Sequence, residues 1–377
     1  MMRRHLWIAL SGQACMPTAT PKSDGTARFD TAIESADDTG LDGVDTNETM
    51  AILSTVAADF SMGAIATIDL ETLEVNDALA STSGDAVVRT AEGRAIVLNR
   101  LNTDTVRLYD PDDWTAPLIE FALPDLANPQ DAVICDDRLW ITQHNRAEIT
   151  AHQISSGLVV GSIDLTRWAG TDGAAEAASL VAIGSTLWIA VQQFKQDDGW
   201  ASEGGAILSA PCSGGDAREV LNIGPSPGLT ASPDDSFFAI RTGLYGPLDG
   251  AVHLYDRTSG TLTELLTEEE VGADITSVAL TQTHAVVVTA TQDWTYRLSC
   301  IDLESRELTQ GLETPQFLSD LTINQAGQAW VASRPGWAAG TASSGEVLVF
   351  DPTTCRSLLA DGSAITTTLN PYNLAFL

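Results

Sequence analysis

The chain has 377 residues and carries 51 acidic against 19 basic side chains, which gives a formal net charge of −32 at pH 7. This negative charge argues against a nucleic-acid-binding protein, because phosphate recognition needs a basic surface. A hydrophobic content of 44% allows a large core, and no apolar run approaches the ~18 to 20 residues of a membrane-spanning helix.

Residues 1–14 have the parts of an export signal: positive charge at Arg3, a short apolar stretch from Leu6, and the small Ala14 before Cys15. This order resembles the lipobox of bacterial lipoproteins, whose cysteine is lipidated after cleavage. The resemblance implies an extracytoplasmic protein of the cell envelope that meets the membrane only through a lipid on Cys15. The lipobox prefers leucine where this chain has Gly12, so an unusual secretion signal or a misassigned start is the alternative.

Residues 15–50 are predicted to be the lipidated cysteine followed by a disordered acidic tether. Pro, Thr, Ser, Gly and Asp dominate this stretch and leave little to bury. Its acidic spacing suggests a calcium loop, but a loop that begins at Asp38 places Thr49 where a bidentate Glu is required. We therefore interpret the segment as a solvated spacer ahead of a folded region that spans residues 51–377.

A repeat runs through that folded region. The segments Leu139-Trp140-Ile141, Leu187-Trp188-Ile189 and Ala329-Trp330-Val331 share one shape, and each follows a turn. Similar apolar segments between them give a period of 44 to 50 residues. A second series, typified by Tyr109-Asp110-Pro111 and Phe350-Asp351-Pro352, places an Asp where a strand ends and a turn begins. Four short strands in each unit of roughly 45 residues are typical of a β-propeller blade.

The number of units predicts a single all-β domain with seven blades of four antiparallel strands. Six complete units begin near Asp85, Asp131, Ser179, Gly228, Thr276 and Asp320. Residues 51–79 supply three more strands, and residues 370–377 supply one. We expect this C-terminal strand to be innermost in the first blade and to close the ring, which removes open sheet edges. Six or eight blades are the alternative counts.

The turn followed by Leu-Trp-Ile or Ala-Trp-Val, with the Asp-centred turn, resembles the repeats of bacterial YVTN-type propellers, which include exported surface-layer-like proteins. The resemblance spans about residues 51–377 and implies a propeller scaffold whose ligand is left open. We expect the repeated tryptophans to be core residues between blades.

Four cysteines remain after Cys15, namely Cys135, Cys212, Cys300 and Cys355. Their wide spacing does not favour a zinc site. In an exported chain they could form disulfides in any of three connectivities, or they could be buried thiols.

The propeller register predicts two rings of charge around one mouth of the central channel. The starts of the innermost strands carry Asp85, Asp131, Glu176, Asp274, Asp320 and the amide Asn373, whereas blade five has Gly228. The ends of the second strands carry Arg100, Arg146, Lys195, Arg241 and Arg334, with Asp293 in blade six. Five of only 19 basic residues therefore fall on one rim.

Three interpretations of these rings stay open. The two rings could neutralise each other, since buried carboxylates need partners. The acids and Asn373 could instead hold Ca²⁺, which prefers six to eight oxygen ligands. Otherwise the cations, with His144, Tyr245, Trp294 and Trp337 nearby, could bind an anionic or sugar-like ligand by charge and stacking.

Catalytic signatures are sparse. The segment from Gly224 to Gly228 matches G-x-S-x-G by letter, but Pro227 has no N–H and a strand is expected after it, so it is not a nucleophile elbow. The histidines show no metal-ligand spacing, and no glycine-rich phosphate loop is present. No catalytic residue is predicted.

Two functions therefore compete. The first is a lipid-anchored propeller that binds an envelope protein or an anionic, saccharide-like ligand through Arg100, His144, Arg146, Lys195, Arg241, Trp294 and Arg334. The second follows from similarity to gluconolactonase-type hydrolases and streptogramin lyases, some of which hold a divalent cation in the channel. It implies a metal-dependent lactonase or lyase with Asp85, Asp131, Asp274, Asp320 and Asn373 as metal ligands.

Overall fold

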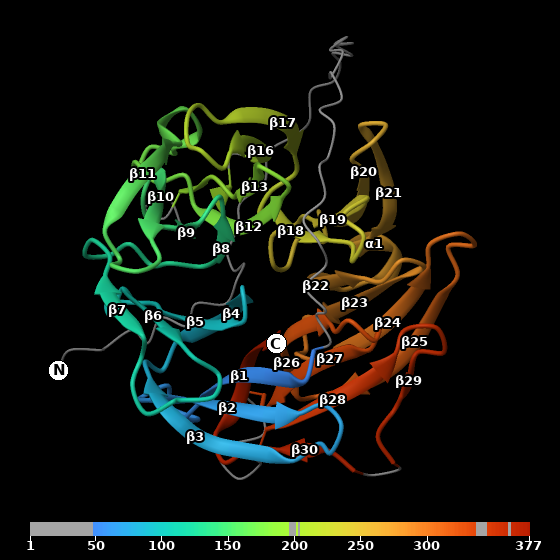
Figure 1. The fold of residues 1–377 in the computed structure, drawn as a ribbon. Helices are drawn as coiled ribbons and strands as arrows, with labels where there is room; N and C mark the ends of the chain where they lie inside the picture. Colours follow the sequence, from blue (N-terminus) through green and yellow to red (C-terminus); the bar gives the residue numbers. More distant parts are fainter. Residues whose placement is uncertain (1–47, 196–200, 203, 337–344, 361–362) are drawn as a thin grey trace, which may run out of the picture.

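A computed structural model describes residues 48–195, 201–202, 204–336, 345–360 and 363–377. Seven β-sheets stand around a central axis like the blades of a propeller (Figure 1). The predicted all-β class and the count of seven blades are confirmed. Cys15, the export signal and nearly all of the tether lie outside the described residues.

Each blade runs from an innermost strand at the axis to an outer strand at the rim. Blade one consists of β31 (Asn370–Phe376), β1 (Met50–Val56), β2 (Gly63–Asp69) and β3 (Val75–Thr82). Blade two consists of β4 (Ala86–Ala91), β5 (Arg94–Asn99), β6 (Thr105–Tyr109) and β7 (Ile119–Ala122). Blade three consists of β8 (Ala132–Cys135), β9 (Arg138–Thr142), β10 (Glu148–Gln153) and β11 (Val159–Asp164).

The remaining blades follow the same order. Blade four consists of β12 (Ala177–Ile183), β13 (Thr186–Val191), β16 (Gly205–Pro211) and β17 (Arg218–Ile223), and β14 (Phe194–Lys195) pairs with β15 (Ala201–Ser202) beside it. Blade five consists of β18 (Gly228–Ala231), β19 (Phe237–Arg241), β20 (Ala251–Asp256) and β21 (Thr261–Thr267). Blade six consists of β22 (Asp274–Leu280), β23 (His284–Ala290), β24 (Tyr296–Asp302) and β25 (Leu308–Thr314).

Blade seven has a divided outer strand. It consists of β26 (Phe317–Ile323), β27 (Ala329–Arg334) and β28 (Glu346–Asp351), and the two short strands β29 (Arg356–Ser357) and β30 (Ile365–Thr366) both pair with β28. Within the described ranges, the helical elements are a 3₁₀ turn at Thr166–Trp168 and the short helix α1 (Glu268–Val271). No helix there is long and apolar enough to cross a membrane.

The C-terminal strand closes the ring as the sequence predicts. β31 is the innermost strand of blade one and pairs antiparallel with β1, with Leu374 opposite Leu53 (Figure 1). Trp330 of blade seven then packs edge-on against Phe376 of β31, with ring centroids 5.6 Å apart. The last strand therefore completes both a sheet and the interface between two blades.

The repeated tryptophans are core residues in two of the three units. Trp140 and Trp330 are almost completely buried, whereas Trp188 is partly buried. Burial of one large apolar side chain is worth about 1.5–3 kcal/mol, so Trp140 and Trp330 each contribute substantially to the stability of the ring.

Two disulfides settle the pairing of the cysteines. Cys135 bonds to Cys212 and joins blade three to blade four, while Cys300 bonds to Cys355 and joins blade six to blade seven. Each bond links neighbouring blades rather than strands of one blade, so it holds an interface of the ring.

We expect removal of the Cys135–Cys212 bond to destabilise the protein by about 2–4 kcal/mol, because the bond constrains a long stretch of the unfolded chain. The double variant Cys135→Ser, Cys212→Ser should show this loss in urea denaturation, with the corresponding Cys300, Cys355 variant as its counterpart. Addition of a reductant should bring the wild type to a lower midpoint than either double variant. An unchanged midpoint after complete reduction would contradict the prediction.

Candidate functional site

The central channel is a cavity of about 1170 Å³. All seven innermost strands line it, through Val87, Ala132, Leu180, Leu229, Val278, Leu321 and Leu374 among others. The side chains of Arg89, Gln192, Arg241 and Trp294 reach the same cavity from different blades. The channel is therefore one continuous space in which groups from several blades meet.

The acidic residues predicted as one ring lie in two tiers. Asp85, Glu176 and Asp274 stand where their innermost strands begin, and we call these residues the outer tier. The inner tier comprises the residues that accept a hydrogen bond from the next blade, namely Asp131, Ser179, Asp320 and Asn373. A β-bulge after Ala177 places Ser179 opposite Ala190, and the same irregularity after Leu318 places Asp320 opposite Ala332. One extra residue in these strands thus separates positions that sequence spacing alone treats as equivalent.

Inner-tier side chains hold neighbouring blades together. Each accepts a hydrogen bond from a backbone N–H of the next innermost strand, which is the exposed edge of its own sheet. In the order Asp131, Ser179, Asp320 and Asn373, the donors are Leu180, Leu229, Leu374 and Val88, at N···O distances of 2.8, 3.3, 2.8 and 2.7 Å. The inner tier therefore replaces the missing strand partner at four of the seven junctions.

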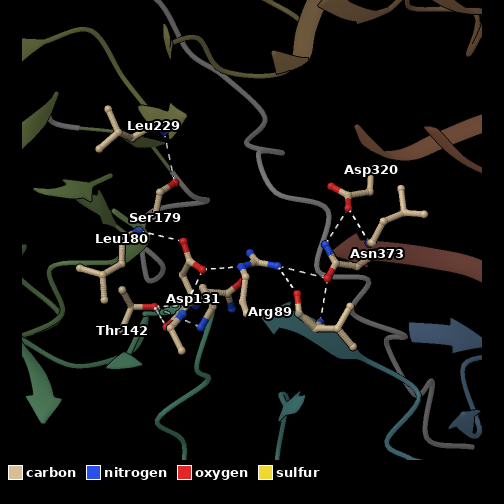
Figure 2. A network of polar contacts seen from close by, with 12 residues as sticks. Arg89, Asp131, Thr142, Ser179, Leu180, Leu229, Asp320 and Asn373 are labelled. Atoms are coloured by element: carbon tan, nitrogen blue, oxygen red, sulfur yellow. Dashed lines mark hydrogen bonds and ion pairs between the residues drawn. The ribbon is translucent and has the colours of Figure 1, made fainter. Parts of the chain in front are cut away.

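Arg89 joins two members of this tier, as Figure 2 shows. Its Nε donates to Asp131 Oδ1 at 2.5 Å, and its Nη1 donates to Asn373 Oδ1 at 3.1 Å. Asn373 also donates through Nδ2 to Asp320 Oδ2 at 2.8 Å. Hydrogen bonds thus connect blades seven, one, two and three in one network around the channel.

The acids do not fit the predicted calcium site. No group of three or more His, Cys, Asp or Glu side chains with metal-binding geometry occurs among the described residues. Asp85 pairs with Arg100, Asp274 accepts from the Gly246 N–H at 2.7 Å, and the other three predicted ligands belong to the hydrogen-bond network above. At least one oxygen of each of these side chains accepts from a protein donor, whereas Ca²⁺ needs several oxygens turned to one point.

Arg100 belongs to a buried cluster with Asp85 and Tyr372. The Arg100 guanidinium bonds to Asp85 and donates to Tyr372 Oη at 2.8 Å, and Tyr372 Oη donates to Asp85 Oδ1 at 2.9 Å. Burial raises the pKa of Tyr372 to about 12, which keeps the phenol protonated. This cluster ties β31 of blade one to blade two, so its role is to hold the closed ring.

Three more of the predicted cations are not among the residues that line the channel. Arg334 lies over the rings of Phe317 and Phe60, with its Cζ 4.3 and 5.0 Å from the centroids. Arg146 is half-buried and pairs with Glu148 at 3.3 Å. Lys195 lies half-buried in β14, outside the set of residues that line the channel.

Arg241 differs from the other four cations. It lies half-buried at the end of β19, lines the channel, and has no ion pair within the described parts of the chain. Its contact is a long hydrogen bond from Nη1 to Ser226 O at 3.5 Å. Desolvation lowers the pKa of Arg241, although a guanidinium remains charged. A positive charge therefore faces the channel with a weak acceptor beside it, and the nearby Glu268 carboxylate attracts it without an ion-pair contact.

A row of neutral polar groups approaches Arg241 from blades three and four. His144 Nε2 lies 3.3 Å from Gln192 Oε1, and Gln192 Nε2 donates to Ser226 Oγ at 3.3 Å. Burial lowers the pKa of His144, so its imidazole is neutral at pH 7. Ser226 is fully buried and strand β18 follows it, which agrees with the rejection of this serine as a nucleophile.

One aromatic ring borders the same space, with a second ring stacked behind it. Trp294 lines the channel and stacks on Tyr245 with centroids 5.2 Å apart and planes inclined by 21°. Such a surface suits stacking against an apolar or sugar ring. The predicted partner Trp337 lies outside the described residues, and Asp293 is exposed in the turn next to Trp294.

Two carboxylates fix the loop 243–250 that carries Tyr245. The buried Glu268 accepts from the N–H of Gly250 and of Ile275, both at 2.8 Å, and Asp274 accepts from Gly246. Gly243 has φ of +121°, and a Cβ there would lie 2.6 Å from Glu268 Oε1, so the loop requires glycine at this point. Burial raises the pKa of Glu268 to about 7.

Arg89, Gln192 and Tyr372 are site residues that the sequence reasoning missed. Arg89 and Tyr372 lie inside innermost strands, where strand alternation alone does not show which side faces the channel. Gln192 follows directly after β13. In blade four it holds the position that Arg100 holds in blade two and Arg334 in blade seven. Alignment of the units by this position, rather than by charge, is the signal that identifies it.

Comparison with solved structures supports the fold. The chain is similar to the periplasmic gluconolactonase of Pseudomonas aeruginosa, with 14% identity, a TM-score of 0.58, and coverage of 87% of this chain and 99% of that one. It is also similar to a proposed 6-phosphogluconolactonase of Bacteroides fragilis, with 13% identity, a TM-score of 0.60, and coverage of 89% and 100%. No family model and no curated protein matches the chain, and the YVTN-type resemblance stays a prediction.

The raised pKa of Glu268 predicts a pH dependence of stability. Between its ordinary pKa of 4.5 and about 7, the folded protein retains a proton that the unfolded chain has released. The contribution of Glu268 therefore falls as pH rises through this window and is lost above about pH 7.

The variant Glu268→Gln should remove this part of the pH dependence. The free energy of unfolding of the wild type relative to the variant should fall on the order of 2 kcal/mol between pH 5 and pH 8. Urea denaturation at both pH values measures it, and Glu269→Gln, at the exposed neighbouring residue, is the control. Parallel curves for wild type and Glu268→Gln would refute the prediction.

Proposed function

We propose that the protein is an exported propeller that binds a small anionic ligand in its central channel. The observation that carries the proposal is Arg241, a cation that lines the cavity without an ion pair in the part of the chain that the structure describes. The desolvation of a charge costs free energy unless a partner compensates it, so a channel-facing guanidinium favours an anion.

The surroundings of Arg241 support a small, hydroxylated ligand rather than a protein partner. The cavity volume of about 1170 Å³ accommodates a sugar-sized molecule. The neutral row from His144 through Gln192 offers hydrogen bonds without further charge, and Trp294 offers a stacking surface. A net charge of −32 keeps large acidic partners away, which favours a ligand that fits inside the channel.

Lactone hydrolysis is the second candidate, favoured by the fold shared with the Pseudomonas aeruginosa gluconolactonase. A fold is compatible with many activities, and the channel acids do not fit the cation of a metal-dependent hydrolase. An assay for turnover of sugar lactones, run alongside binding, separates this candidate from a binding protein.

Export is supported by the two disulfides, because such bonds persist in oxidising compartments and are rare in the cytosol. We extend the proposal to a lipid anchor at Cys15, with the acidic segment up to residue 50 as a tether. The anchor rests on the lipobox-like order of residues before Cys15.

Small anions should stabilise the protein against heat, and neutral sugars of the same size should do so less. A thermal-shift screen with monocarboxylates, sugar acids, sugar phosphates and matched neutral sugars measures this difference. Arg241→Gln should weaken binding of the best anion about tenfold, since a charge-assisted hydrogen bond is worth about 1.5–3 kcal/mol. Arg146→Gln, which removes the same charge at a residue that does not line the channel, should leave it unchanged. A screen in which no anion stabilises the wild type would exclude the proposed function.

The anchor predicts where the protein is found after cell fractionation. The full chain should partition with membranes, and Cys15→Ser should move it to the soluble fraction, because the lipid is its proposed membrane contact. Cys135→Ser, Cys212→Ser serves as a control for general effects of cysteine loss. Identical distributions of the Cys15→Ser variant and the wild type would rule out lipidation at Cys15.

A further inference from the structure

One backbone N–H in the inner tier lacks the acceptor that its counterparts have. Four of the seven innermost strands donate to the preceding blade, as described above. Two more, at Ala132 and Leu321, donate to the aspartates that immediately precede them, Asp131 and Asp320. The seventh is the N–H of Val278 in β22, for which no side chain of the described ranges is an acceptor.

The orientation of this N–H follows from the ladder of blade six. Thr281 N donates to His284 O at 2.8 Å, which makes that pair hydrogen-bonded. Antiparallel pairs alternate, so Ala279 and Val286 form the next bonded pair and Val278 opposite Val287 is a non-bonded pair. The Val278 N–H therefore points away from β23, toward the space that a side chain of blade five would fill.

Gly228 explains why that side chain is missing. Gly228 lies opposite Arg241. It directly precedes Leu229, whose N–H donates to Ser179, just as the inner-tier residues Ser179 and Asn373 directly precede the donors Leu180 and Leu374, so Gly228 holds the inner-tier position of blade five. Thr230, two residues further along β18, donates to Val278 O at 3.2 Å, so the two strands are adjacent here. An aspartate at position 228 would reach the Val278 N–H as Asp131 reaches that of Leu180.

The guanidinium of Arg241 lies next to the same place. A Cβ on Gly228 would be 3.0 Å from Arg241 Nε and 3.2 Å from Arg241 Cγ. In blades one and three, Asn373 and Asp131 bind both a backbone N–H and Arg89. The junction of blades five and six has the N–H of Val278 and the guanidinium of Arg241, but Gly228 of blade five has no side chain that could supply the acceptor.

We propose that Gly228, Arg241 and Val278 form a carboxylate subsite, in which the carboxylate of the ligand takes the place of the inner-tier side chain that blade five lacks. This inference rests on the proposed function and specifies its ligand class. One carboxylate oxygen accepts from the Val278 N–H and the other from the Arg241 guanidinium, as protein carboxylates do in the neighbouring blades. Arg89 and Arg100 also line the channel but are paired with Asp131 and Asp85, so one cation without an ion pair in the described ranges, Arg241, favours a monoanion over a phosphate dianion.

The test installs the missing side chain. Gly228→Asp places a carboxylate between Arg241 and the Val278 N–H, so it should raise the melting temperature and exclude the carboxylate of the ligand. Thr90→Asp is the matched control, because it adds the same charge to the channel from β4 of blade two, away from Val278 and Arg241. The probe is glucuronate, compared with its neutral amide glucuronamide, by isothermal titration and tryptophan fluorescence.

We expect the wild type to prefer glucuronate to glucuronamide by about tenfold or more, Gly228→Asp to lose that preference, and Thr90→Asp to keep it within about threefold. Where Gly228→Asp does not fold, Gly228→Ser replaces it. Its hydroxyl should accept from Val278 as Ser179 accepts from Leu229, and weaken glucuronate binding severalfold.

Equal binding of glucuronate and glucuronamide, or unchanged glucuronate binding by a folded position-228 variant, overturns the subsite. If these results refute the subsite but the protein still binds another anion through Arg241, the proposed function is retained. Failure of every anion in the thermal-shift screen removes both.

Discussion

Seven innermost strands face one narrow channel, and each has an edge with no strand beside it. An unpaired edge exposes N–H groups that must find acceptors, since a buried orphan N–H costs about as much as a lost hydrogen bond. The inner tier meets this constraint with carboxylate, amide and hydroxyl oxygens from the preceding blade. The polar residues of the channel therefore have mainly a structural role. Most of them already form hydrogen bonds within the protein, so few can contact a ligand.

This constraint gives meaning to the exception in blade five. Side chains at one recurrent position join the blades by hydrogen bonds. A residue that cannot accept a hydrogen bond at this position is therefore easily recognised. Gly228 has no side chain that could accept a hydrogen bond, and Arg241 lies in the space where that side chain would be. A ligand from solution can therefore accept the hydrogen bonds that an inner-tier side chain accepts at the other junctions. The candidate site arises from the loss of one side chain at a recurrent position of the fold.

The fold could be predicted from the sequence because its signals recur. The apolar segment around Trp140 and the turn around Asp110 are repeated at nearly constant spacing, so strand number and ring closure follow from counting. The two tiers could not be predicted, because a bulge after Ala177 shifts a strand by one residue without a trace in composition. The pairing of Cys135 with Cys212 depends on contact between two blades, and Arg89 lies inside a strand where spacing does not show its direction.

Ring closure through β31 has a consequence for how the protein folds. This strand follows all the other strands in chain order, yet it is the innermost strand of the first blade. Blades two to seven can assemble from neighbouring segments as they become available, whereas blade one must wait for a partner more than 300 positions away, since β1 begins at Met50 and β31 at Asn370. Until that partner arrives, β1 presents a free edge, and this long-range contact makes the final step the slowest and the most exposed to mispairing.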